Sequence, residues 1–155
     1  WKFHGGDELA GPKAARAVLL KHSVPDDTID HISEIIRTMS FKGASVKTDM
    51  RTLEGKAVQD ADRLDAIGAI GIARTFAYGG SKNRLIHNPE ARPTPHQTKE
   101  AYFNDKGSTI NHFYEKLLLL KSRMNTDTGK RLAESRHQFM KEYLNRFFRE
   151  WRGKM

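Results

Sequence analysis

Apolar residues recur every three or four positions along several stretches of the chain, which is the spacing of one face of an α-helix. The first stretch, residues 11–22, begins with a glycine and a proline, and proline suits a first helical position. The second begins at Pro25 and two aspartates and carries isoleucines on one face, so we expect it to end near Ser40. No stretch alternates between apolar and polar residues as a half-buried strand does. The pattern therefore predicts an all-α fold.

The central stretch from Val58 to Tyr78 has helical spacing and is crowded with small side chains, including Gly68 and Gly71. Small residues let a second helix pack closely, whereas each glycine inside a helix costs about 1 kcal/mol relative to alanine. We therefore expect one long helix that ends at Gly79-Gly80 and has a packing or ligand-binding reason for its glycines.

Two more helices are predicted in the C-terminal third, at residues 110–124 and 128–151. The last is strongly amphipathic, and its apolar stripe is expected to face the core. The stripe consists of Leu132, Phe139, Met140, Tyr143, Leu144, Phe147, Phe148 and Trp151. Between the central helix and these two, residues 81–109 contain three prolines and few apolar side chains. That composition predicts a long irregular loop, which we expect to act as a lid.

Composition narrows the class of protein. A chain of 155 residues fits one domain. Because it contains no cysteine, disulfides, thiolate metal sites and cysteine nucleophiles are excluded, and a reducing cytoplasmic location is favoured. The longest apolar run, Leu117–Leu120, is far shorter than the roughly 20 residues that cross a membrane. We predict a cytoplasmic protein without a membrane partner.

Two further features concern the start of the chain and its charge. The chain begins with Trp1 rather than methionine, so we expect further residues upstream in the complete gene product. The formal net charge of +8 favours an anionic partner, and nucleotides, nucleic acids and acidic surfaces all qualify.

One carboxylate in the central stretch is expected to need an arginine or a bound cation as its partner. On a helix that turns by about 100° per residue, Asp62 shares a face with Val58, Asp65 and Ala69, while Asp60 points almost the opposite way. This places Asp62 on the small, apolar face. A buried carboxylate must be paired or bound to a cation. The partner is either an arginine such as Arg51 or Arg74, or a metal ion, and the pattern alone leaves both open.

The run from Glu54 to Arg74, with Gln59-Asp60-Ala61-Asp62-Arg63-Leu64-Asp65 at its centre, resembles the last metal-ligand segment of small HD-domain phosphohydrolases. Further matching motifs are Ser40–Lys42, Phe76–Gly80 and His112–Leu118, so the resemblance extends over nearly the whole chain. It implies that residues 1–155 form one all-α, HD-domain-like helical bundle, as the larger, C-terminal part of such an enzyme.

In that family an early histidine, an adjacent His-Asp pair and a distant aspartate surround a divalent metal. The resemblance maps the distant aspartate onto Asp62 and maps the other ligands onto no residue of this chain. The family pair would fall just upstream of Trp1, so those ligands are either outside this chain or lost. The implied metal is manganese, magnesium, iron or nickel, which would activate water for attack on phosphorus.

The branch that this sequence resembles cleaves nucleoside triphosphates to the monophosphate and pyrophosphate. Substrate phosphates need fixed cations, for which the candidates are Lys116, Arg74, Lys42, Arg84 and Lys2. Asp65 and His31 are the candidates for a catalytic role beside the metal. Each of these residues also has an ordinary alternative, namely a surface charge, a helix salt bridge or a packed histidine.

Two other functions remain as alternatives. The first is a basic helical module that grips nucleic acid through Arg146, Arg149, Arg152 and Lys154. The glutamates among these cations and the absence of a docking motif argue against it. The second is a catalytically silent member that senses nucleotides. A homodimer is compatible with the sequence and is not indicated by it.

Overall fold

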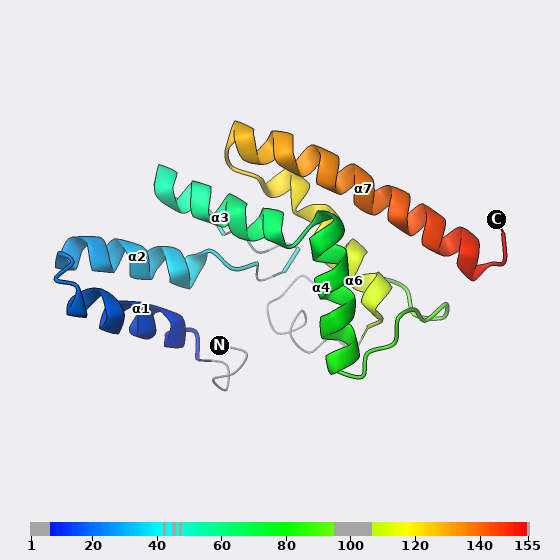
Figure 1. Ribbon diagram of the computed structural model, residues 1–155, viewed down its shortest axis with the longest axis horizontal. Coiled ribbons are helices and arrows are strands. Elements are labelled where there is room, and N and C mark those ends of the chain that lie inside the picture. The colour runs from blue at the N-terminus through cyan, green and yellow to red at the C-terminus, as the bar shows by residue number, and fades with distance from the viewer. Residues whose placement is uncertain (1–6, 42, 45, 47, 95–106, 155) are drawn as a thin grey trace.

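The computed structural model describes residues 7–41, 43–44, 46, 48–94 and 107–154, and every regular element within them is a helix. The expected all-α fold is therefore confirmed. Two antiparallel helices, α1 (Ala10–Lys21) and α2 (Asp26–Thr38), form a hairpin at one end of the molecule (Figure 1). Their bounds agree with the sequence pattern. The connecting turn places Ser23 at φ 53°, and Ile29 of α2 is fully buried.

The predicted long central helix is wrong, because the chain forms two helices there, α3 (Leu53–Asp65) and α4 (Gly68–Ser81), which cross at a steep angle (Figure 1). The break lies at Gly68, whose φ of +78° only glycine adopts without strain. A β-carbon at Gly68 would also lie 3.0 Å from the side chain of Arg136. Gly68 is therefore the first residue of a second helix, at a position that favours glycine, and does not lie inside one long helix.

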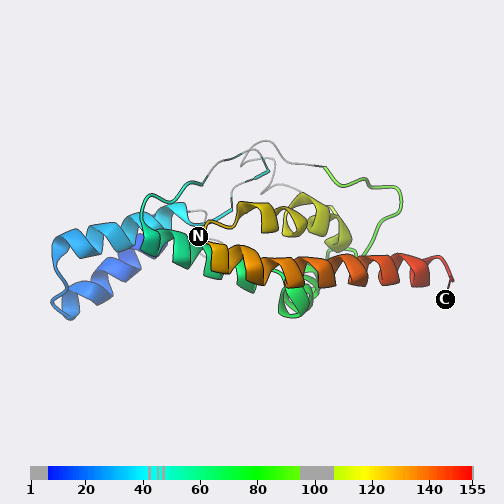
Figure 2. The same cartoon turned by 90° about the horizontal axis from the view of Figure 1, so that it is seen from above.

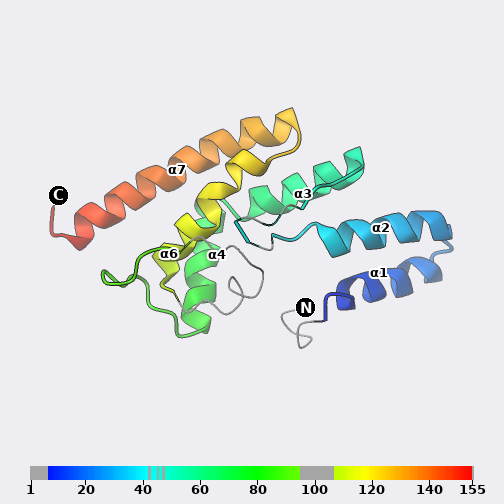
Figure 3. The ribbon, with the colours of Figure 1, turned by 180° about the vertical axis from the view of Figure 1, so that it is seen from behind.

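A further correction concerns residues 110–124, which were expected to form one helix. The structure has a short helix, α6 (Thr109–Glu115), followed by two 3₁₀ turns, η1 (Leu117–Leu119) and η2 (Lys121–Arg123), that lead to the start of α7 (Figure 3). The backbone leaves the α conformation at Lys116, with φ −140° and ψ −61°. The tighter turns bring both Leu117 and Leu120 into the core, where each is at most 2% exposed.

The long helix α7 (Asp127–Trp151) agrees closely with the predicted helix and runs along α3 and then across α4. Its stripe forms the core only in part: Met140 and Leu144 are buried, whereas Leu132, Phe139 and Trp151 are 40–51% exposed. Tyr143 stacks on the fully buried Phe113 of α6, with ring centroids 6.0 Å apart. Leu132 and Trp151 lie toward the two ends of the helix and Phe139 lies at its middle, so the exposed part of the stripe is not confined to the helix ends.

The irregular segment after α4 is anchored at several points where the structure describes it, residues 82–94 (Figure 2). The imidazole of His87 packs edge-on against Phe147, Phe148 and Trp151 of α7, with centroid distances of 5.0–5.9 Å. The carbonyl oxygen of Leu85 accepts a hydrogen bond from the N–H of Thr109 at 2.8 Å. Residues 95–106 of the predicted lid lie outside the described part of the chain.

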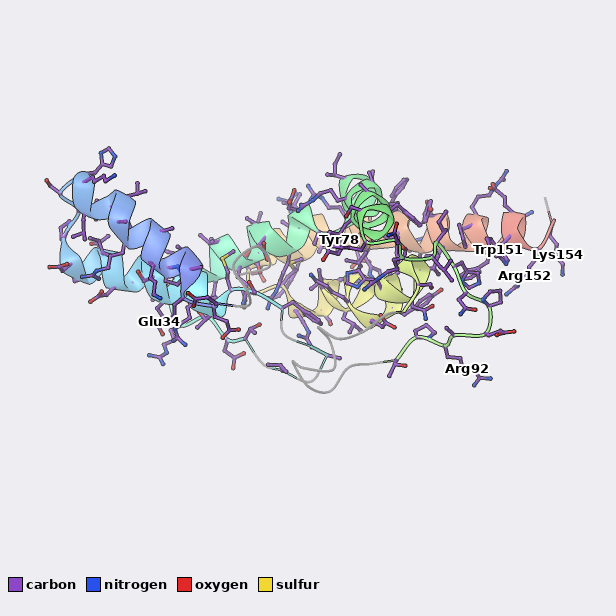
Figure 4. The ribbon with its side chains drawn as sticks, turned by 90° about the horizontal axis from the view of Figure 1, so that it is seen from below. Glu34, Tyr78, Arg92, Trp151, Arg152 and Lys154 are labelled. Atoms are coloured by element: carbon purple, nitrogen blue, oxygen red, sulfur yellow. The ribbon has the colours of Figure 1, made fainter. Side chains whose placement is uncertain are left out.

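Figure 4 shows Trp151, Arg152 and Lys154 at the C-terminal end of α7. They lie far from Glu34, which belongs to α2 in the hairpin. None of the described helices combines the length and the hydropathy that crossing a bilayer requires.

Candidate active site

Helix α3 carries the central motif and has a polar buried face and a largely apolar outer face. Gly55, Gln59, Asp60 and Arg63 are buried, whereas Asp62 and Asp65 are exposed. The structure confirms that Asp62 shares the small, apolar face with Val58 and Asp65 and that Asp60 points the opposite way, but the expected burial of that face is wrong. The physical reason is that the polar side chains of the buried face find hydrogen-bond partners on distant segments.

Asp60 accepts the largest number of hydrogen bonds among these side chains. Its Oδ1 accepts hydrogen bonds from the backbone N–H and the side-chain amide of Asn125, at 2.8 and 2.9 Å. Its Oδ2 accepts from the backbone N–H and the hydroxyl of Thr126, both at 2.8 Å. Burial by itself would raise the pKa of Asp60, but these hydrogen bonds outweigh it and hold the pKa below its usual value. Asp60 therefore fixes the start of α7.

Gln59, Arg63 and Arg123 hold the irregular segment between α2 and α3. The amide of Gln59 donates to the carbonyl oxygens of Met39 and Thr48, at 3.2 and 2.8 Å. The guanidinium of Arg123 donates to the carbonyl oxygens of Gly43, Ala44 and Val46 and lies 4.8 Å from the ring centroid of Phe41. Arg63 donates in turn to the carbonyl oxygen of Arg123. Local sequence patterns predicted no role for Gln59, Arg63 or Arg123, because their partners are far away along the chain.

The exposed faces of α3 and α4 form an outer stripe of small and apolar residues. It consists of Leu53, Ala57, Val58, Ala61, Ala69, Ile70, Ala73 and Ala77, together with Asp62, Asp65 and Arg74. Leu53, Val58 and Ile70 are 71, 44 and 66% exposed. Large exposed apolar side chains on two neighbouring helices favour a site of interaction here. Asp62 lies within the stripe, and the described residues offer it neither a hydrogen bond nor a salt bridge.

Asp65 and Arg74 join the α3 and α4 parts of the outer stripe. Nη1 of Arg74 donates to the carboxylate Oδ2 of Asp65 and, at 3.4 Å, to the backbone oxygen of the same residue. Asp65 lies one helical turn after Asp62 on α3, so all three polar residues of the outer stripe occupy one region. Of the predicted site residues, the structure brings together these three.

His31 is not brought to this region. It lies on α2, and its Nε2 is 3.1 Å from the hydroxyl of Thr52, the residue that caps the start of α3. Measured from Thr52, Asp62 lies about 15 Å further along the axis of α3. The structure thus places His31 where it links the hairpin to α3, and a catalytic role for it remains a prediction.

The structure describes two of the other predicted phosphate-binding cations, Lys116 and Arg84. Lys116 is half-buried, with its Nζ 5.6 Å from the ring centroid of Phe41. Arg84 follows the C-terminal end of α4, where its backbone N–H donates to the oxygen of Gly79 at 2.9 Å. Lys2 and Lys42 lie outside the described residues.

A metal ion requires several ligands on one site, and the described residues do not provide them. No group of three or more His, Cys, Asp or Glu side chains within the described ranges could hold a metal. The outer stripe contains Asp62 and Asp65, and Asp65 is already paired with Arg74. The described part of this chain therefore does not fit a complete metal site by itself.

Solved structures of related proteins match this fold. A protein of Lactobacillus plantarum is 46% identical, with a TM-score of 0.80 over 88% of this chain and 64% of that one. An HD-superfamily hydrolase of Bacillus thuringiensis is 43% identical, with a TM-score of 0.67 over 94% of this chain and 64% of that one. No protein-family model matches the sequence.

YpgQ of Bacillus subtilis, itself described as uncharacterized, is 39% identical over 136 residues, which are 87% of this chain and 58% of YpgQ. A crystal structure of YpgQ in complex with ADP matches with a TM-score of 0.67 and 36% identity, over 90% of this chain and 63% of that one. The chain thus spans less than two thirds of the length of these relatives. With such identities over most of its own length, the chain belongs to the HD-domain family.

Proposed function

We propose that the complete protein is a metal-dependent phosphohydrolase that cleaves nucleoside or deoxynucleoside triphosphates to the monophosphate and pyrophosphate. Membership of a family that includes an HD-superfamily hydrolase supports the hydrolase activity. The ADP complex of the relative YpgQ supports a nucleotide substrate. The observation that carries the proposal is Asp62, a carboxylate without a hydrogen bond or salt bridge among the described residues, set in an exposed apolar stripe.

Asp62 contributes one metal ligand in this proposal, and the others come from the part of the family fold that this chain does not span. That part would pack on the outer stripe. Once the stripe is covered, a lone carboxylate becomes prohibitively costly, so Asp62 then needs a cation. Manganese, magnesium, iron or nickel suits such a site, and the bound metal supplies an activated water.

Arg74 is the proposed phosphate contact on this chain, because it shares the outer stripe with Asp62. Guanidinium groups bind phosphate through several N–H donors in a fixed plane. Lys116, Arg84, Lys42 and Lys2 remain proposed phosphate contacts from the sequence resemblance alone.

The test is a hydrolysis assay on the complete gene product with manganese, across the common nucleoside and deoxynucleoside triphosphates, with phosphate and pyrophosphate measured separately. We expect pyrophosphate release that a chelator abolishes and that Asp62→Ala reduces to background. Asp127→Ala is the matched control, since the Asp127 side chain is fully exposed at the start of α7. Full activity in Asp62→Ala would contradict the metal assignment. ADP binding without hydrolysis of any triphosphate would favour the silent, nucleotide-sensing alternative.

A further inference from the structure

The ion pair of Asp65 and Arg74 engages only one edge of the guanidinium. Both contacts, to the carboxylate and at 3.4 Å to the backbone oxygen of Asp65, are made by Nη1 of Arg74. Within the described residues, Nη2 and Nε of Arg74 have no hydrogen-bond acceptor. The arginine is therefore held at one edge and has N–H groups available at the other.

Stability does not explain this pair. The Asp65 and Arg74 side chains are 62% and 61% exposed, and ion pairs at such exposure contribute little to folding. Asp65 is also the last residue of α3, where the helix dipole disfavours a negative charge. An acidic residue at this position therefore needs another reason, and its contact with Arg74 provides one.

The pair also lies where a substrate phosphate is expected. Asp62 precedes Asp65 by three residues on α3, so both carboxylates face the same side of the helix. An anion held beside Asp62 by a cation would lie about one helical turn from the Asp65–Arg74 pair. The anchored guanidinium would bind it at a lower entropic cost than a freely rotating side chain, because its orientation is already fixed.

We infer that Asp65 is a positioning residue that orients Arg74 to bind a substrate phosphate, and that it is not itself a reaction acid, base or metal ligand. This inference rests on the proposed function, because it concerns the same site. It differs from the sequence-based expectation, in which Asp65 had a direct catalytic role.

The test compares Arg74→Ala, Asp65→Ala, Asp65→Glu and the double variant in the complete gene product. Loss of a charge-assisted phosphate contact in Arg74→Ala is expected to raise KM for the triphosphate by about 10- to 100-fold, with a smaller change in kcat. Asp65→Ala should raise KM by roughly 3- to 10-fold, and Asp65→Glu should recover part of that loss. The double variant should be no worse than Arg74→Ala, since Asp65 acts through Arg74.

Glu150→Ala is the matched control, because Glu150 forms an Arg–carboxylate pair with Arg146 on α7 at 58% and 66% exposure. It should leave both KM and kcat unchanged. Thermal unfolding of each variant checks that the fold persists. A fall in kcat without a change in KM for Asp65→Ala, an added loss in the double variant, or a changed melting temperature with unchanged kinetics would each overturn the inference.

ADP affinity, measured by calorimetry on the same variants, separates this inference from the proposed function. If wild-type protein binds ADP but hydrolyses no triphosphate, the proposed activity fails. A loss of ADP affinity that is larger in Arg74→Ala than in Asp65→Ala would then still support the positioning role. If ADP binds equally to wild type, Arg74→Ala and Asp65→Ala, the positioning role fails even when hydrolysis is observed. A wild-type protein that neither hydrolyses triphosphates nor binds ADP contradicts both.

Discussion

Oδ2 of Asp60 accepts hydrogen bonds from both the backbone N–H and the hydroxyl of Thr126, each at 2.8 Å. Thr126 is the N-cap residue of α7, so one buried carboxylate on α3 fixes where the longest helix of the protein begins. This relationship assigns a structural role to Asp60 and separates it from Asp62, two residues further along the same motif.

Replacing the carboxylate of Asp60 should destabilise the fold. Asp60→Asn keeps the shape but points an amide N–H₂ at groups that are themselves donors, so we expect a loss of about 2–4 kcal/mol in the free energy of unfolding. Chemical denaturation at neutral pH measures it. An unchanged denaturation midpoint would show that the Asn125 and Thr126 contacts do not stabilise the protein.

The effect of Asp60→Asn should depend on pH. Because the pKa of Asp60 is lowered in the folded protein, its stabilisation is complete above the unfolded-state pKa of about 3.9 and is lost as the pH falls through the folded-state value. The difference between wild type and Asp60→Asn should therefore be greatest above about pH 5 and shrink below about pH 4. A constant difference over that range would contradict the lowered pKa.

Gly129 permits the approach of Asp60 to α7. A β-carbon there would lie 2.4 Å from Oδ2 of Asp60, so Gly129→Ala should destabilise the protein by about 1–3 kcal/mol despite the higher helix propensity of alanine. Gly80→Ala is the control, since no atom lies within 4 Å of a β-carbon at that position of α4. It should be neutral or stabilise by up to about 1 kcal/mol. Equal effects of both substitutions would refute the steric explanation.

Arg123 should control the order of the segment between α2 and α3. Arg123→Met leaves the carbonyl oxygens of Gly43, Ala44 and Val46 without their donor, and we expect a loss of about 2–4 kcal/mol and faster proteolysis within residues 39–52. Arg131→Met, on the exposed side of α7, should change neither. Proteolysis at the wild-type rate in Arg123→Met would show that the segment is held by other contacts.

A charged substitution in the outer stripe should affect stability differently in the 155-residue chain and in the complete gene product. In the 155-residue chain Ile70 is 66% exposed, so Ile70→Lys should preserve stability and reduce binding of a hydrophobic dye. If the further residues proposed above cover the stripe in the complete gene product, the same change should cost about 2–4 kcal/mol there, because a lysine would then be buried. Leu20→Lys, at 53% exposure on α1, is the comparison. An equally small effect of Ile70→Lys in both proteins would rule out the covering segment.

The helical class, the bounds of α1, α2 and α7, and the family could all be predicted from the amino-acid sequence. Local signals are sufficient for these properties: proline and acidic residues at helix starts, a regular apolar spacing, and a motif-rich run from Glu54 to Arg74. Each depends on residues close together in the chain, which interact in much the same way in any fold.

The buried face of α3 and the break in the central helix became visible only in the folded chain. The buried face is polar, because Gln59, Asp60 and Arg63 find partners on η2 and at the start of α7, more than 50 residues away. The apolar face is exposed among the described residues, so the usual rule that apolar side chains mark the inside predicted burial for Asp62, which is exposed. Burial of a polar side chain depends on whether distant donors and acceptors satisfy it, and local spacing carries no information about them.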